Sequence, residues 1–258
     1  MKEKFYEATN ENMQAVNTGI RRENPHQTII SICSAADIPI WLTTLAEKVI
    51  AVDNNQAQID FAKKRTEELK NGRFKKFLSA RGNTFLDRIA LRFSLLTHIT
   101  QSDLNITFKK VLALDPEIVR LFTASVSSSY IYSFNVSCPS TVLRNYFWLE
   151  NARMEKAREN LHKLFFSKND ITLEIEKNLK SEDITGVYLS NVTSMMNADE
   201  ITKLLASLNK LPRFCRIYSA EILSGKLPSR LEINETISEE VYKKRNLSFS
   251  PTVYDVTD

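Results

Sequence analysis

The sequence has 258 residues, of which 43% are hydrophobic, enough for one α/β domain with a substantial core and an insertion. No apolar stretch reaches the roughly 18 to 20 residues that a helix needs to cross a bilayer. The polar first residues lack the apolar centre of a secretory signal. We therefore expect a cytoplasmic protein without stable membrane insertion.

The charges are nearly balanced, with 35 Lys and Arg against 31 Asp and Glu, and the two signs are interspersed. Domains that bind nucleic acids usually show a basic stripe with aromatic residues between the charges, so a nucleic-acid partner is disfavoured. A phosphate-bearing small substrate and a weak attraction to an anionic membrane surface both remain compatible with a net charge of +4. The oligomeric state has no signature in the sequence.

The cysteines and histidines give no sign of a disulfide framework, a metal cluster or a hydrolase. Cys33, Cys138 and Cys215 are odd in number and scattered, which favours reduced core thiols, and we expect no structural metal. The three histidines lie far apart, and no Gly-x-Ser-x-Gly elbow accompanies them.

The first third of the chain predicts a helical lead-in followed by strand, turn, helix, strand and helix. Residues 1–25 form the lead-in, in which residues 11–22 are a short helix that can lie across a ligand as a lid. The apolar run TIISI predicts a first strand, and IAVD a second strand that ends in Asp53. The segment AQIDFAKKRTEELKNG then predicts a long helix that Asn71 and Gly72 close as a C-terminal cap.

Residues 83–168 predict a helical insertion that shapes the pocket of an acceptor substrate. Asp115-Pro116-Glu117 is a favourable helix start, because proline is tolerated and acids are favoured in a first helical turn. The aromatic residues of the insertion either line that pocket or belong to the core. After it, ITLEIEKNL, GVYLSNV and FCRIYSAEIL predict further strands. Strands that alternate with helices predict a Rossmann-like α/β fold, with a mostly parallel sheet covered on both faces.

In such a sheet, ligands bind beyond the carboxyl ends of the strands. The turn after the first strand reads Ser34-Ala35-Ala36-Asp37 and lacks the glycines that approach a pyrophosphate, so NAD and FAD are disfavoured. S-adenosylmethionine carries no phosphate and needs only a small turn and an acid for its ribose, which Asp53 can supply. The alternatives are that the turn is merely compact and that Asp53 caps the following helix.

Three stretches, SICSAAD (residues 31–37), AVDNNQAQIDFAKKR (51–65) and ITGVYLSNVTSMM (184–196), together with Tyr6 and Asn10-Glu11, resemble one family. It is the 3-amino-3-carboxypropyl transferases related to betaine-lipid synthase, a branch of the class I methyltransferase-like fold. The chain departs from the family in having no glycine in the first turn. It also reads Leu211-Pro212-Arg213 where the family has Pro-Gly-Gly.

The resemblance implies S-adenosylmethionine as co-substrate and transfer of its aminocarboxypropyl group, with release of methylthioadenosine. Methyl transfer and a non-catalytic module with a decayed site remain alternatives. The expected acceptor is a small molecule or natural-product intermediate that offers a phenol, an amine or a nucleotide phosphate. Tyr6 is expected near the reacting centre. Glu176 is expected at the adenine amine, although an exposed acid that caps a helix is an equally good interpretation of Glu176. The expected cofactor-binding residues are Ser34, Ala35, Ala36, Asp37, Asp53, Asn54, Gln58, Glu176, Ser190 and Asn191.

Overall fold

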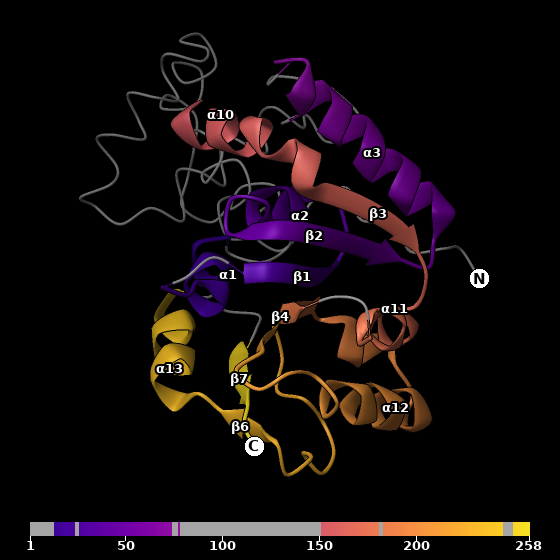
Figure 1. The fold of residues 1–258 in the computed structure, drawn as a ribbon, viewed down its shortest axis with the longest axis vertical. Helices are drawn as coiled ribbons and strands as arrows, with labels where there is room; N and C mark the ends of the chain where they lie inside the picture. Colours follow the sequence, from indigo (N-terminus) through magenta and orange to yellow (C-terminus); the bar gives the residue numbers. More distant parts are fainter. Residues whose placement is uncertain (1–12, 24–25, 74–76, 78–150, 181–182, 245–249) are drawn as a thin grey trace, which may run out of the picture.

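The computed structural model describes residues 13–23, 26–73, 77, 151–180, 183–244 and 250–258 (Figure 1). Most of the predicted insertion and the first twelve residues lie outside these ranges. The described residues form a seven-stranded sheet in the order β3-β2-β1-β4-β5-β7-β6. The strands are β1 (His26–Ile32), β2 (Ala46–Asp53), β3 (Leu164–Lys168), β4 (Ile184–Ser190), β5 (Arg216–Ser219), β6 (Leu231–Ile233) and β7 (Thr252–Val256).

The first five strands pair in parallel, and β7 runs antiparallel to both β5 and β6. The chain builds β1, β2 and β3 outward in one direction and then crosses back to place β4 on the other side of β1 (Figure 1). This reversal is the topological switch point at which open α/β sheets bind ligands. The predicted Rossmann-like sheet of the class I methyltransferase type is confirmed.

Two layers of helices cover the sheet. One core cluster joins a sheet face to α1 (Met13–Ile20), α2 (Asp37–Leu42), α3 (Gln56–Lys70), α10 (Asn151–Glu159) and α13 (Glu235–Lys244). A second cluster joins the opposite face to α11 (Ile171–Asn178) and α12 (Ala198–Leu208). Two 3-10 turns, η1 (Leu161–Lys163) and η2 (Val192–Met195), complete the described elements. No helix in the described ranges is long and apolar enough to span a membrane.

The two faces follow from the alternation of side chains along each strand. In β2, Val49 and Ala51 belong to the first cluster, whereas Ile50 and Val52 belong to the second. All four are buried, because helices cover both faces, and the strand therefore reads as a continuous apolar run. This run made β2 readable in the sequence.

The long helix predicted after Asp53 is confirmed as α3. Asn55 is its N-cap and accepts a hydrogen bond from the backbone N–H of Ala57, so the alternative that Asp53 caps this helix is wrong. At the other end, Asn71 is the C-cap, and Gly72 has a φ of 68°, the left-handed conformation for which glycine is favoured. The predicted cap is confirmed.

The strand predicted at ITLEIEKNL is wrong, because these residues form helix α11. The strand lies just before it, as β3, inside the region predicted to be a helical insertion. Asp170 starts the helix by accepting a hydrogen bond from the Thr172 backbone N–H at 2.8 Å. Ile171 and Ile175, four residues apart, then both face the core. The spacing of apolar residues fits a helix as well as it fits a strand, and the cap decides between them.

Helix α1 falls within the predicted lead-in helix and has a buried side. Met13, Val16 and Ile20 are fully buried, and the helix packs on α13 and β5. Residues 1–12 lie outside the described residues, so the lid across the ligand stays a prediction.

Candidate functional site

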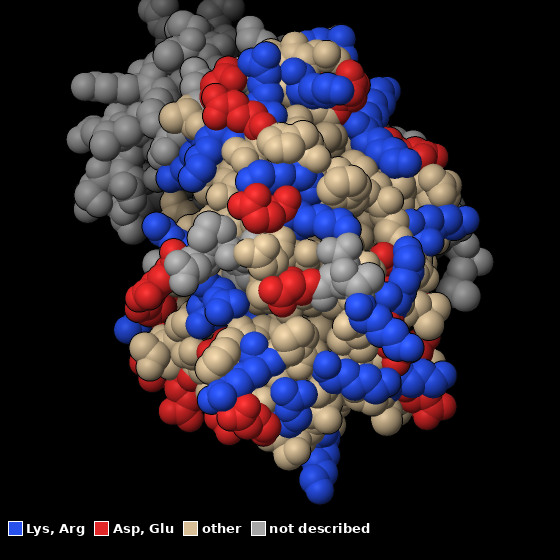
Figure 2. Space-filling model, viewed as in Figure 1, with Lys and Arg blue, Asp and Glu red and all other residues tan. Residues whose placement is uncertain are grey.

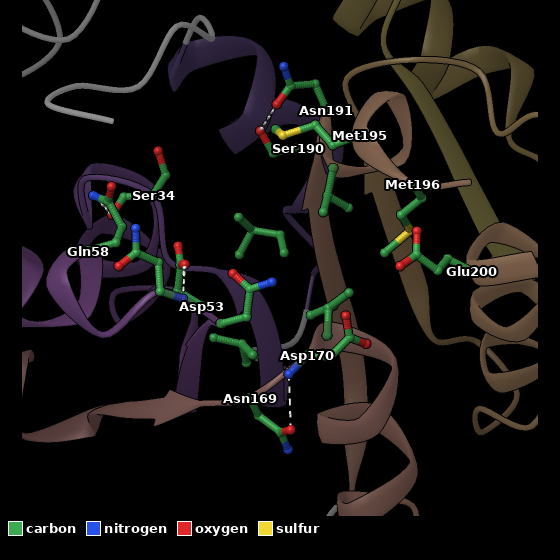
Figure 3. Close-up of a pocket in the computed structure, with 16 residues that line it drawn as sticks. Ser34, Asp53, Gln58, Asn169, Asp170, Ser190, Asn191, Met195, Met196 and Glu200 are labelled. Atoms are coloured by element: carbon green, nitrogen blue, oxygen red, sulfur yellow. Dashed lines mark hydrogen bonds between the residues drawn. The ribbon is translucent and has the colours of Figure 1, made fainter. Parts of the chain in front are cut away.

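A cleft of about 560 Å³ opens at the carboxyl ends of β1 to β4 (Figure 3). Its walls come from the residues that follow each strand: Ser34 after β1, Asp53 at the end of β2, Asp170 after β3 and Asn191 after β4. Its volume lies within the range of about 300–1,000 Å³ that is usual for small-molecule sites. The cleft therefore occupies the switch point of the sheet and is large enough for a ligand.

The cleft contains six of the predicted site residues, namely Ser34, Asp53, Asn54, Gln58, Ser190 and Asn191. Four others lie elsewhere among the described residues: Ala35, Ala36, Asp37 and Glu176. Tyr6 lies outside the described residues. The rule that ligands bind at carboxyl ends thus brought together residues that are more than 150 positions apart in the chain.

The turn after β1 has a strained backbone that α3 supports. Ser34 and Ala36 have φ angles of 45° and 67°, in the left-handed region that costs about 1–2 kcal/mol for a residue with a Cβ. The Gln58 side-chain amide donates a hydrogen bond to the Ser34 carbonyl at 2.7 Å, and the Arg65 guanidinium donates one to the Ala35 carbonyl. These bonds hold the turn in a backbone conformation that glycine adopts more readily than residues with a Cβ.

Asp37 is an anchor of this turn and does not line the cleft. Its two carboxylate oxygens accept hydrogen bonds from Arg65 Nη1 and Nη2 at 2.9 and 2.8 Å, and both side chains are almost fully buried. Arg65 also donates to the Phe77 carbonyl and lies over the Phe77 ring. The prediction that Asp37 contacts a cofactor does not fit this placement, because both of its oxygens are engaged. The side chains of Ala35 and Ala36 are fully buried and serve the same turn.

Asp53 lies in the cleft with one carboxylate oxygen free. Its Oδ1 accepts a hydrogen bond from the backbone N–H of Asn55 at 2.9 Å, and Oδ2 has no partner among the described residues. Burial raises the pKa of Asp53, and the hydrogen bond from Asn55 only partly opposes this. The carboxylate is thus poorly solvated and gains from a ligand that donates hydrogen bonds to it.

Two further carboxylates in the cleft, Asp170 and Glu200, were not predicted as site residues. Asp170 Oδ1 is held by the Thr172 N–H at 2.8 Å, and Glu200 Oε2 by the Asn197 N–H at 2.8 Å. In each, the second oxygen has no hydrogen-bond partner in the part of the chain that the structure describes. Figure 3 shows Glu200 on the wall opposite Asp53, with Asp170 between them toward one end of the cleft.

The end of β3 is fixed by the buried carboxylate of Glu174. It accepts hydrogen bonds from Ser167 Oγ at 2.7 Å, and from Asn169 Nδ2 and Asn178 Nδ2 at 2.9 Å. Burial alone would raise the pKa of Glu174, but these hydrogen bonds outweigh it and the pKa is lowered. Asn169 in turn accepts the N–H of Asp170. Glu174 therefore sets the backbone position from which Asp170 reaches the cleft.

The end of β4 carries the second strained residue of the cleft. Ser190 has a φ of 55°, and its carbonyl accepts the backbone N–H of Ala220 at 2.8 Å. Its hydroxyl lies 3.3 Å from Asn191 Oδ1, as a donor to it. Asn191 is the first residue before η2, but its side chain makes no capping hydrogen bond. The amide nitrogen of Asn191 thus remains available to a ligand. Met195 and Met196 add an apolar surface beside it.

Glu176 does not reach the cleft, and the prediction that it meets an adenine amine is wrong. It lies exposed on α11, where it accepts hydrogen bonds from Ser207 and Lys210, which lower its pKa. The misplaced strand caused this error, because Asn169 and Asp170 are the residues that follow the true β3. Asp170 occupies the strand-end position for which Glu176 was proposed.

Cys33 and Cys215 are buried free thiols whose pKa is raised by burial. Within the described ranges, no group of three or more His, Cys, Asp or Glu side chains is arranged to hold a metal ion. The absence of a structural metal stays a prediction.

Comparison with known proteins gave no matching family model and no matching curated protein. Among solved structures, the chain is similar to the rRNA methyltransferase AviRa from Streptomyces viridochromogenes in two structures, both with 13% identity. The first match covers 94% of this chain and 80% of AviRa, with a TM-score of 0.40. The second covers 95% and 81%, with a TM-score of 0.37. At such low scores the likeness carries no weight beside the sheet order and the cleft.

Proposed function

We propose that the cleft binds S-adenosylmethionine and that the protein transfers a carbon group from it to a small nucleophile. The supporting observation is the set of charges in the cleft. Asp53, Asp170 and Glu200 each have one oxygen held by a backbone N–H and one without a partner, and no Lys or Arg is among the described lining residues. Such a site favours a ligand that is cationic and rich in hydrogen-bond donors.

S-adenosylmethionine fits these groups better than a phosphate-bearing cofactor. Its sulfonium is positive, its ribose offers two hydroxyl donors to Asp53, and its adenine offers an amino group to Asp170. A pyrophosphate would meet three carboxylates and a turn without glycine or basic side chains. The free amide of Asn191 and the backbone of the turn at Ser34 remain for the amino-acid part.

Within this function we propose aminocarboxypropyl transfer, on the basis of the family resemblance, with methyl transfer as the alternative. The positive sulfur already activates each attached carbon, so the protein must mainly orient one carbon toward the acceptor and exclude water. Two described polar residues at the end of β4, Ser190 and Asn191, can orient the sulfur of the ligand and its attached carbons.

The test is calorimetric titration with S-adenosylmethionine and, for comparison, with NAD, followed by chromatography of the nucleoside released in the presence of acceptors. We expect binding of S-adenosylmethionine alone, with methylthioadenosine as the product. Release of S-adenosylhomocysteine would assign the protein to methyl transfer. Absence of binding to S-adenosylmethionine and to both product nucleosides would overturn the proposal.

A further inference from the structure

The cleft is acidic although the protein is slightly basic. The chain carries a net charge of +4, and Lys and Arg are numerous over the face shown in Figure 2. In the cleft, the charged residues among those described are all carboxylates: Asp53, Asp170 and Glu200. A concave site of one charge sign concentrates ligands of the opposite sign. The cleft therefore favours cations, although the protein as a whole is slightly basic.

The cofactor proposed above does not engage all three carboxylates. Asp53 ends β2 and suits the ribose, and Asp170 begins α11 and suits the adenine amine. Glu200 comes from the first turn of α12, on the opposite wall from Asp53, next to the methionine surface of Met196 (Figure 3). Its Oε1 has no partner in the described part of the chain, and Oε2 is held by the N–H of Asn197. Glu200 is thus an oriented acceptor with no group of the cofactor assigned to it.

We infer that the acceptor substrate is a small amine, and that Glu200 binds its ammonium or amino group. This inference rests on the proposed function and names its substrate class. Among the acceptors expected from the sequence, a nucleotide phosphate would be repelled by three carboxylates, and a phenol would gain no charge pairing from Glu200. An amine gains from both the field of the cleft and a directed hydrogen bond.

The chemistry of an amine balances without a further reactant. The ammonium first gives one proton to water, and the neutral nitrogen forms a bond to a carbon attached to the sulfur of S-adenosylmethionine. The carbon–sulfur bond breaks, and its electron pair stays on sulfur, which leaves as a neutral thioether. The nitrogen of the product, now bonded to the transferred carbon, then carries a positive charge or loses a second proton to water.

The experiment compares matched ligands on protein saturated with S-adenosylhomocysteine, so that binding is measured apart from turnover. Putrescine is compared with 1,4-butanediol, and glucosamine is compared with glucose and glucose 6-phosphate, by calorimetry. We expect each amine to bind about threefold to fivefold more tightly than its uncharged analogue, because Glu200 is exposed and water weakens its pairing with an ammonium, and we expect the phosphate not to bind.

Glu200→Gln is the matched variant, because its side-chain carbonyl can still accept the N–H of Asn197 and keep the helix cap. Asp199→Asn is the control, since Asp199 is an exposed acid on the same turn, as Glu200 is, but does not line the cleft. Glu200→Gln should remove most of the preference for amines while S-adenosylhomocysteine binds as before, and Asp199→Asn should keep the preference.

Two results distinguish a failure of the proposed function from a failure of the inference about the acceptor. If the protein binds no S-adenosylhomocysteine or S-adenosylmethionine, the proposed function fails, and the inference that depends on it fails as well. If it binds S-adenosylhomocysteine but neither amine exceeds its neutral or phosphorylated analogue, or Glu200→Gln leaves the preference intact, the inference on the acceptor is overturned alone.

Discussion

Replacing Asp53 by Asn separates the contribution of this carboxylate to ligand binding from its contribution to stability. Burial raises the pKa of Asp53 in the folded protein, so ionising it costs more in the folded state than in the unfolded state. The penalty sets in as the pH rises through the unfolded-state pKa and is complete above the folded-state pKa. Asn carries no such penalty and keeps an oxygen for the N–H of Asn55. At neutral pH the variant should therefore be as stable as the wild type or more stable.

Ligand binding should change in the opposite direction. An ionised carboxylate can accept the ribose hydroxyls as charge-assisted bonds, whereas in Asn the oxygen stays on the N–H of Asn55 and the amide nitrogen, which is a donor, replaces the ligand-facing Oδ2. The loss expected from these two bonds is about 2 kcal/mol, which is about 30-fold in Kd. Calorimetric titration with S-adenosylmethionine measures this directly.

Urea unfolding of the same variant at neutral pH completes the assay. Asp60→Asn is the control, because Asp60 is an exposed acid of α3 whose carboxylate accepts a hydrogen bond from the Gln56 side-chain amide. The reasoning would be refuted by an Asp53→Asn protein that binds as tightly as the wild type, or that loses more than about 1 kcal/mol of stability. In either case Asp53 would be a structural acid.

Three further changes probe the fold around the site. Gly19→Ala should destabilise by about 1–3 kcal/mol in urea unfolding despite a gain of about 1 kcal/mol in helix propensity, because its Cβ would lie 2.5 Å from the buried Tyr218 ring. Arg65→Met should cost about 3–5 kcal/mol by removing the Arg65 partner of the buried Asp37 carboxylate, and adding Asp37→Asn should recover much of this loss. The pKa of Glu174 is lowered in the folded protein, so its stabilisation is present above the unfolded-state pKa and is lost as the pH falls through the folded-state pKa. Glu174→Gln should be less stable at neutral pH but lose less stability on acidification, as unfolding at a series of pH values would show.

The sequence predicted the sheet where its strands are apolar and covered on both faces. The runs at β1, β2 and β4 could be read directly, and the carboxyl-end rule then placed Ser34, Asp53 and Asn191 in one site. β3 was missed because LFFSK is short and continues the helical pattern of α10. With that strand misplaced, Asp170 could not be recognised as a strand-end acid.

The role of Asp37 could not be read from the sequence for a different reason. Asp37 follows a turn that suits a ligand, and its partner Arg65 lies 28 residues away on the buried face of α3. Only the packing of α3 against the turn brings Asp37 and Arg65 together, and the spacing of residues along the sequence does not predict this contact. Strand β7 was likewise missed, because it has only five residues, TVYDV, of which one is an acid.

The strain in the cleft bears on whether the site has decayed. Among the described residues, four other than glycine have a left-handed backbone, and three of them, Ser34, Ala36 and Ser190, lie at the ends of β1 and β4. Each costs about 1–2 kcal/mol and persists only when surrounding contacts hold it. Gln58 and Arg65 do so for the first turn, and the hydrogen bonds to the Ser190 carbonyl do so for the other. Backbone strain of this kind clusters at functional sites, so Ser34, Ala36 and Ser190 support our proposal of a working cleft over the alternative of a decayed site.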